Sequence, residues 1–317
     1  MSKFKIRHVT RYLYEDAVRD SANQVMLYPI DDDFQEIQYH TIVITGNPQL
    51  NVHEDYYGNK VGTFTHAQPH RELVIDSQLV VVTRSRSLPA DNQPVDAQWT
   101  ELHALKHDIR FIDFLRQENF SALDELRSVM EQVRCKECSP LASARDLCKY
   151  VFDEFRYRKG ITTVETTVEE IWKIKSGVCQ DFAHILLVML RQLGIPSRYV
   201  SGYICPNKSG MRGEGATHAW VEAYMPQYGW LGLDPTNNCI VNETHVRLAV
   251  GKNFSDCSPV KGTYRGTSNH TLEVSVTVSY EDGNTSTGDN AEVTYSAPKT
   301  SEYHNSFRRY QEMQQQQ

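Results

Sequence analysis

The chain lacks a long apolar run. None of its 317 residues lies in an uninterrupted apolar stretch of the roughly 18 residues that indicate a membrane-spanning helix. Residues 1–8 carry scattered charges and do not form the apolar segment of a signal peptide. A basic cluster is also missing, and the net charge of −7 gives no electrostatic reason to bind nucleic acid or an anionic membrane. We therefore expect a cytoplasmic protein without nucleic-acid or membrane partners.

Cysteine is scarce as well. Seven cysteines are an odd number, and their spacing is not that of a disulfide framework, which predicts reduced thiols. Cys135 and Cys138 have the two-residue spacing of half a zinc site or of a redox pair, but no second such pair follows them. We therefore expect no metal site and no cofactor.

The amino-terminal part has the pattern of short strands. Segments such as 42–45 and 73–82 are rich in apolar and β-branched residues, and turn residues such as 57–60 separate them. Short strands at this spacing predict an antiparallel β-sandwich, which we assign to residues 1–85. Residues 86–120 are richer in Pro, Asp, Gln and His, and we interpret them as a linker with short helices.

The following part has helices first and strands afterwards. Residues 141–152 place their apolar side chains on one helical stripe, and a later helix is expected to begin near Cys179. Strands are expected at 198–204, 219–224, 230–234, 272–280 and 292–295. This order predicts an α+β core, with helices packed on an antiparallel sheet, over residues 121–298. Residues 299–317 have too few apolar side chains to pack, and we expect a disordered polar tail.

Cys179 lies where a glycine-bearing turn leads into the apolar segment 182–193. A cysteine in the first turn of a helix sees the positive end of the helix dipole, which favours the nucleophilic thiolate. Nucleophilic catalysis also needs a base and a group that orients the base. His218 and Asp234 follow downstream in that order. The residues therefore predict a Cys-His-Asp site.

Strand pairing is expected to bring His218 and Asp234 together. If residues 225–229 form a five-residue loop, Tyr224 faces Trp230, and the apolar residues of both strands sort onto one face. His218 and Asp234 then share the other face as diagonal neighbours, roughly 7–8 Å apart, from where their side chains can meet. A slip of one residue would separate them.

Three residues in these roles predict covalent catalysis on an amide. Cys179 attacks the carbonyl carbon, His218 stabilises the thiolate and protonates the leaving amine, and Asp234 fixes the tautomer of the ring. The backbone N–H of Cys179 is the natural first donor to the oxyanion, and no second donor is assigned. Water resolves the resulting thioester by hydrolysis, whereas an amine resolves it by transamidation.

Nearby polar residues have simpler interpretations. His184 is five residues after Cys179 and points away from it on a helix, so we expect a packed, hydrogen-bonded histidine. Asp181 lies in the first turn, where a capping role is the expected one. Trp220 and Trp230 either line a substrate groove or cover the sheet.

Four segments carry a specific pattern in chain order, namely 177–184, 198–203, 218–222 and 234–237, and three more lie at 12–14, 27–29 and 55–59. With these segments, over roughly residues 1–280, the chain resembles the transglutaminase-like (papain-related) cysteine enzymes of the bacterial type with an N-terminal β-domain. The resemblance implies that Cys179, His218 and Asp234 form a catalytic triad. Calcium-dependent animal members have additional β-barrel domains, for which this chain has no length, and calcium activation is not implied.

We therefore expect a cysteine-dependent hydrolase of the peptidase or amidase type that acts on amide bonds of peptides or proteins. Hydrolysis is favoured because water is always present, and the sequence displays no dedicated amine site. Two alternatives stay open. One is protein-glutamine transamidation with an amine co-substrate, and the other is a non-catalytic module that binds a peptide.

Overall fold

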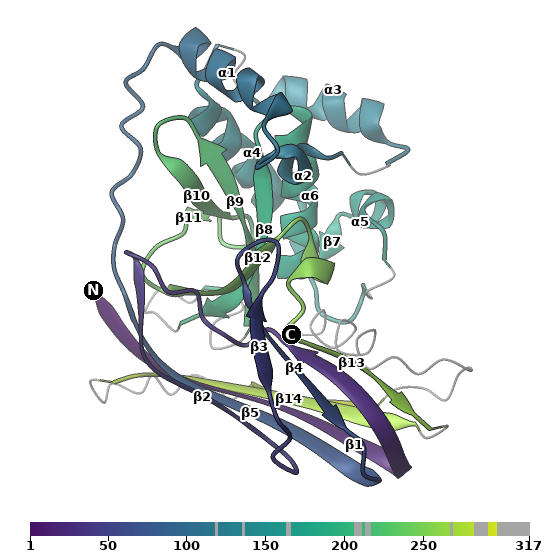
Figure 1. Cartoon of the computed structure of the whole chain (residues 1–317). Helices are drawn as coiled ribbons and strands as arrows, with labels where there is room; N and C mark the ends of the chain where they lie inside the picture. Colours follow the sequence, from purple (N-terminus) through teal and green to yellow (C-terminus); the bar gives the residue numbers. More distant parts are fainter. Residues whose placement is uncertain are drawn as a thin grey trace.

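The computed structural model describes residues 1–117, 120–134, 137–162, 166–205, 211–212, 217–266 and 269–281, and the backbone of 291–296. It consists of a curled antiparallel sheet and, beside it, a group of helices packed with a second antiparallel sheet (Figure 1). The predicted α+β class is confirmed. Within the described residues, no helix is long and apolar enough to cross a membrane. The expected disordered tail lies outside these residues.

The curled sheet is built around one long strand, β1 (Ser2–Val25). Its first half pairs with β5 and β14, and its second half pairs with β4 and β13. An irregularity between Leu13 and Val18 lies where the strand passes from one half to the other. The other strands are β2 (Gln35–Ile44), β3 (Asn51–Glu54), β4 (Lys60–His66), β5 (His70–Thr83), β13 (Val260–Arg265), β14 (His270–Tyr280) and β15 (Ala291–Ser296).

Alternation of side chains along β1 explains how this sheet closes on a core. Phe4, Ile6 and Tyr12 are buried, whereas Lys5 and Arg7 between them are exposed, as a strand with one packed face requires. Strands β13 to β15 come from the part of the sequence assigned above to the catalytic core, yet they pair with β1 or with one another. The end of the described chain therefore returns to the N-terminal sheet.

Helices cover the second sheet. They are α1 (Val95–Ala104), α2 (Ile112–Leu115), α3 (Leu123–Val133), α4 (Pro140–Glu154), α5 (Val168–Ile174) and α6 (Cys179–Gln192), with 3₁₀ turns at Leu105–His107 and Phe254–Asp256. Ser139 caps α4 and Thr167 caps α5 by accepting a backbone hydrogen bond. α6 is buried along nearly its whole length, because its sequence is apolar on most sides.

The second sheet has five strands in the order β11-β10-β9-β8-β12, and all pairs are antiparallel. Its strands are β8 (Ser197–Ile204), β9 (Thr217–Met225), β10 (Gly229–Asp234), β11 (Cys239–Ile240) and β12 (His245–Gly251). A short parallel pair, β6 (Arg156–Tyr157) with β7 (Ser176–Gly177), leads into α6.

The two sheets share a core. Tyr203 of β8 and Val246 and Leu248 of β12 pack in the same buried cluster as Phe4 and Leu79 of the N-terminal sheet. Helix α6 and the residues of β9 that face it form a separate cluster. The second sheet therefore lies between its own helices and the N-terminal sheet.

Candidate active site

Cys179 is the first residue of α6, and Val178 before it has extended backbone angles. The backbone N–H of Cys179 consequently has no acceptor within the helix, which leaves it free for an oxyanion. Asp181 closes the turn, since its Oδ2 accepts from Val178 N at 2.8 Å and from Thr162 Oγ1 at 2.8 Å. A Cβ on Gly177 would lie 2.3 Å from that oxygen, so the turn requires glycine there.

Two nearby residues have the structural roles predicted for them. The capping role of Asp181 is confirmed by the bond to Val178, and burial raises the pKa of its carboxyl to about 6. His184 is packed and hydrogen-bonded as expected: its Nε2 accepts from Phe254 N at 3.3 Å, and its ring lies beside Tyr199. Neither residue is needed to explain a catalytic site.

The hairpin of β9 and β10 has the predicted register. Tyr224 pairs with Trp230, and Val221 pairs with Leu233. The apolar residues Ala219, Val221 and Ala223 lie in the core cluster that contains α6. His218 and Asp234 meet as the predicted strand pairing requires, with 2.9 Å between Nε2 and Oδ2.

Asp234 is held by five hydrogen bonds. Oδ2 accepts from His218 Nε2 at 2.9 Å, from Asn237 Nδ2 at 2.7 Å and from His245 Nε2 at 3.3 Å. Oδ1 accepts from the backbone N–H groups of Thr236 at 2.9 Å and of Asn237 at 3.3 Å. Burial alone would raise the pKa of Asp234, but the two histidines and their hydrogen bonds outweigh it and hold that pKa well below its usual range. Asp234 is therefore a fixed anion.

His218 is fully buried beside this anion. Burial lowers the pKa of its ring, but the charge and hydrogen bond of Asp234, joined by the contact with Cys179, raise it to about 10. The ring is therefore an imidazolium at neutral pH. Nε2 is used by Asp234, and Nδ1 has no partner in the described residues that meets ordinary hydrogen-bond geometry. The contact between His218 and the thiol is thus looser than the one with Asp234.

His245 is the site residue that the sequence did not reveal. It begins β12, and its buried ring donates to the same oxygen of Asp234 as His218 does. Burial lowers its pKa, so this second histidine is neutral. No motif singles it out, because a lone histidine at the start of an apolar strand is ordinary.

These side chains also have the spacing of metal ligands. The ligand atoms of His218, Asp234 and His245 all lie within 4.8 Å of one another. Both Nε2 atoms, however, donate to one carboxylate oxygen, and none of the three side chains has exposed surface. A hydrogen-bonded cluster accounts for this arrangement, and we do not assign a metal to it.

Trp220 covers the sheet beside the cluster. Its buried ring meets the His245 ring edge-on, with 5.2 Å between centroids, and lies 6.2 Å from the His218 ring. A Cβ on Gly202 would lie 2.6 Å from this indole and 2.1 Å from Val246 O, so the close packing requires glycine. Trp230 is partly exposed and stacks with Arg198.

The remaining cysteines divide into two groups. Cys148, Cys205, Cys239 and Cys257 are free thiols, as is Cys179. Cys138 is disulfide-bonded, so the expectation of reduced thiols is wrong for that residue. Cys135, its neighbour in the Cys-x-x-Cys pair, lies outside the described residues.

Comparisons with known proteins match both parts of the chain. Residues 127–235 match the transglutaminase-like superfamily, and residues 4–82 match the bacterial transglutaminase-like N-terminal region. An uncharacterized protein of Mycobacterium leprae is 30% identical over 88% of this chain and 99% of its own length. A protein-glutamine gamma-glutamyltransferase of Pseudomonas aeruginosa is 30% identical, but over only 35% of this chain and 18% of its own length.

A solved structure shares the fold over most of the chain. It comes from Cytophaga hutchinsonii and is described as a candidate cysteine protease. The TM-score is 0.69 at 19% identity, and the match covers 89% of this chain and 92% of the other. The identity is too low to transfer an activity. The matches to both regions, and the relative that covers nearly the whole chain, show that this protein belongs to the transglutaminase-like superfamily, with a bacterial transglutaminase-like N-terminal region.

Proposed function

We propose that the protein is a cysteine-dependent hydrolase that cleaves amide bonds of peptides or proteins through a thioester intermediate. Cys179 is the nucleophile, His218 is the acid and base, and Asp234 orients and charges His218. Members of this superfamily are usually enzymes, which supports an active role for a chain that retains all three residues.

One observation carries the proposal. The ring of His218 is held at 2.9 Å by the buried carboxylate of Asp234 and interacts with Cys179, which is the first residue of a helix. Burying charged groups costs free energy that is offset only by close ion pairs and hydrogen bonds, so an arrangement of this kind suggests a specific role. A peptide-binding module would have no need of this arrangement.

The chemistry follows from the positions of the protons. The Cys179 thiolate attacks the carbonyl carbon, and the oxyanion is met by the Cys179 N–H. His218 gives its proton to the leaving amine, and the C–N bond breaks to leave a thioester and a neutral ring. The ring then takes a proton from water, which attacks the thioester. The C–S bond then breaks, the carboxylic acid leaves, and the released thiolate again faces the imidazolium of His218.

The test is the rate of alkylation of Cys179 by iodoacetamide against pH, read by peptide mass spectrometry. Burial raises the pKa of Cys148, Cys205 and Cys257 well above the ordinary value and that of Cys239 to about 12, so these four thiols are slow internal references. We expect Cys179 to label quickly below pH 8 and to lose this reactivity in His218→Ala. Labelling at the rate of the reference thiols would contradict the proposal and favour the peptide-binding module.

Transamidation is the second candidate, because a relative named as a protein-glutamine gamma-glutamyltransferase matches part of the chain. Both reactions pass through the same thioester and differ only in the acceptor. A glutamine-containing peptide library, incubated with and without a labelled primary amine, separates them. We expect free acid as the main product. An amine adduct that exceeds the acid at millimolar amine would reverse this assignment.

A further inference from the structure

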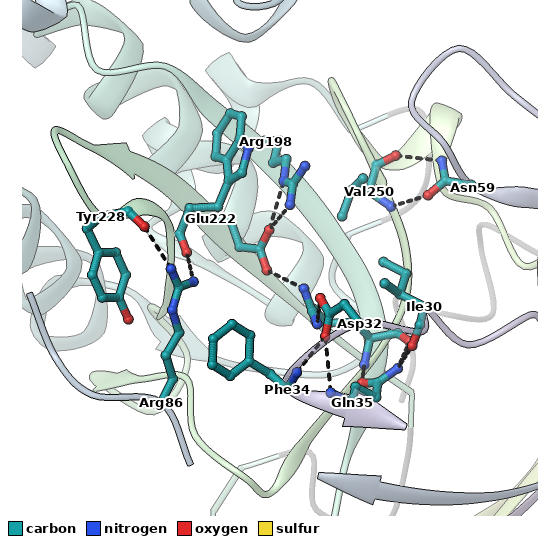
Figure 2. A network of polar contacts seen from close by, with 12 residues as sticks. Ile30, Asp32, Phe34, Gln35, Asn59, Arg86, Arg198, Glu222, Tyr228 and Val250 are labelled. Atoms are coloured by element: carbon teal, nitrogen blue, oxygen red, sulfur yellow. Dashed lines mark hydrogen bonds and ion pairs between the residues drawn. The ribbon is translucent and has the colours of Figure 1, made fainter. Parts of the chain in front are cut away.

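The second sheet, β11-β10-β9-β8-β12, carries His218 and Asp234, and we call it the catalytic sheet. Side chains of residues 1–85, the N-terminal domain, contact its edge strand β12. β12 pairs with β8 on one side and with no strand of the described chain on the other. An unpaired strand edge leaves backbone N–H and C=O groups without partners. Here the amides of Gln35 and Asn59 from the N-terminal domain satisfy these groups (Figure 2).

The contacts are reciprocal at both positions. Gln35 Oε1 accepts from Arg247 N at 2.8 Å, and Gln35 Nε2 donates to Arg247 O at 2.9 Å. Asn59 Oδ1 accepts from Val250 N at 2.8 Å, and Asn59 Nδ2 donates to Val250 O at 2.7 Å. Each amide therefore imitates the peptide group of a neighbouring strand. We call these two residues the β12 clamp.

The clamp residues are themselves fixed by the N-terminal domain. Asn59 closes a turn in which Asp55 accepts from Asn59 N and from Asn59 Nδ2, both at 2.8 Å, while Gly58 takes a φ of +81°. Gln35 is buried, and its Nε2 also donates to Ile30 O at 2.6 Å. These residues are rigid supports and not adaptable surface groups.

Ion pairs of Arg247 also hold β12 in place. Arg247 pairs with Asp32 of the N-terminal domain, and its Nη1 lies 3.8 Å from Oε1 of Glu222 in β9. Arg198 of β8 holds Glu222 at 2.6 Å (Figure 2). Just before β12, Thr83 Oγ1 donates to Glu243 O at 2.6 Å. Contacts from the N-terminal domain therefore bracket His245, the first residue of the strand.

We propose that the N-terminal domain is a working part of the active site: through the β12 clamp it fixes His245, and His245 positions the carboxylate of Asp234 that orients His218. His245 does not touch the substrate and is a positioning residue. The proposal rests on the triad chemistry proposed above and adds a reason why the two domains occur in one chain.

The neighbours of the His245 ring support a positioning role for this residue. The titratable groups that face it are Asp234 and His218, and its other ring nitrogen lies 3.3 Å from Thr244 Oγ1. His245 and Asn237 Nδ2 both donate to the oxygen of Asp234 that accepts from His218, so each of them limits how the carboxylate can turn. If β12 shifted along its edge, His245 would leave Asp234, and the oxygen that accepts from His218 would lose one of its three donors.

The test uses the full chain and the alkylation rate of Cys179 at pH 6.5, with the complete pH profile of each variant. His245→Phe keeps a ring but removes the donor, and we expect a rate about tenfold lower and a profile displaced to higher pH, as the loss of one hydrogen bond to a charged group implies. His245→Gln supplies a donor near the same position, and we expect it to recover the rate to within about threefold of wild type.

The domain side is tested by Gln35→Leu, with Gln38→Leu as the matched control, because Gln38 is exposed on the same strand. We expect about tenfold slower alkylation for Gln35→Leu and no change for Gln38→Leu. Gln35→Leu removes several hydrogen bonds, so Thr83→Val is a milder variant that serves if Gln35→Leu does not fold. It removes the bond to Glu243 O and the longer contact with Ser2 O, and we expect it to slow alkylation about two- to threefold.

The outcomes separate the two proposals. Slow labelling of wild-type Cys179 overturns the proposed function. Fast labelling of wild type, with equally fast labelling of folded His245→Phe and Thr83→Val, leaves the proposed function standing and overturns this inference. A slow His245→Phe that His245→Gln does not improve also overturns it, because the ring would then act only by packing.

Discussion

The two sheets of this protein differ in whether their charged side chains are exposed or buried. On the outer face of the N-terminal sheet, Arg7 pairs with Asp76 and Arg11 pairs with Glu72, and the arginine side chains are 57% and 43% exposed. In the catalytic sheet, the side chains of His218, Asp234 and His245 have no exposed surface, and Glu222 is 6% exposed between two arginines.

This difference indicates where the molecule depends on geometry. An exposed ion pair stays hydrated and contributes less than about 1 kcal/mol, so it can be lost or replaced at little cost. A buried charge is stable only when every partner is in place, and removing one partner costs several kcal/mol. The fold therefore places its costly charges in the second sheet, where the proposed function needs fixed protons, and leaves hydrated ion pairs on the outer face of the N-terminal sheet.

The largest effect is expected when the charge of the buried Asp234 carboxylate is removed. In Asp234→Asn the side chain keeps its shape, but the amide cannot stabilise an imidazolium and favours the wrong tautomer of His218. We expect the hydrolytic rate to fall by about 10³–10⁴-fold, as in other catalytic triads whose carboxylate orients a histidine. Single-turnover release of amine from a substrate found in the library screen measures it. A fall of less than tenfold would show that Asp234 is not the orienting group.

The second test removes the charge between the two arginines. Glu222→Gln leaves Arg198 and Arg247 without their shared anion in a buried site. We expect the free energy of unfolding to fall by about 3 kcal/mol, measured by urea titration. Glu72→Gln on the outer face is the matched control and is expected to change little. Equal losses in the two variants would show that burial does not decide the effect.

Particular residues show how far the sequence predicts this structure. The β9–β10 register was predictable because Ala219, Val221 and Ala223 fit only one face, and the position of Cys179 followed from the glycine turn before an apolar helix. Asp181 and His184 were assigned correctly from their spacing on that helix. In each case the information is local, within one element or one hairpin.

Features that depend on distant contacts were not predictable. β14 alternates like any half-buried strand, and nothing in that pattern says that it pairs with β1 instead of the catalytic sheet. His245 becomes part of the site only because β12 lies at the edge of the sheet near Asp234. The contacts of Gln35 and Asn59 to this strand span 212 and 191 residues of sequence, so only the folded chain reveals the pairing.

The third test uses pH on the buried pair. The pKa of His218 is raised to about 10 in the folded protein from an ordinary 6.5, so the folded state binds more protons than the unfolded state between these values. Stability from this group is fully present below pH 6.5 and is lost as pH rises toward 10. We expect the unfolding free energy of wild type, relative to His218→Gln, to fall by about 4 kcal/mol across this window.

The difference curve is needed because another group titrates there with the opposite sign. Burial lowers the pKa of Lys175 to about 8, so its contribution to stability rises with pH above that value. Since both proteins contain Lys175, its effect cancels in the difference. A flat difference between pH 6.5 and 10 would mean that His218 is not an imidazolium in the folded state.

The smallest effect is expected for the outer-face counterpart of the first test, Asp76→Asn. The Arg7–Asp76 pair has the best geometry an exposed pair can offer, with Nη2 at 2.7 Å and Nε at 3.1 and 3.2 Å from the carboxylate. Good geometry is not enough, because the Arg7 guanidinium keeps most of its water, and the salt in the buffer screens the pair. We expect a loss below about 1 kcal/mol in urea titration, shrinking further at 1 M salt, and an unchanged alkylation rate of Cys179. The same carboxylate-to-amide change would thus abolish catalysis in one sheet and pass nearly unnoticed in the other. If Asp76→Asn instead cost as much as Glu222→Gln, hydration would not be what separates the two sheets.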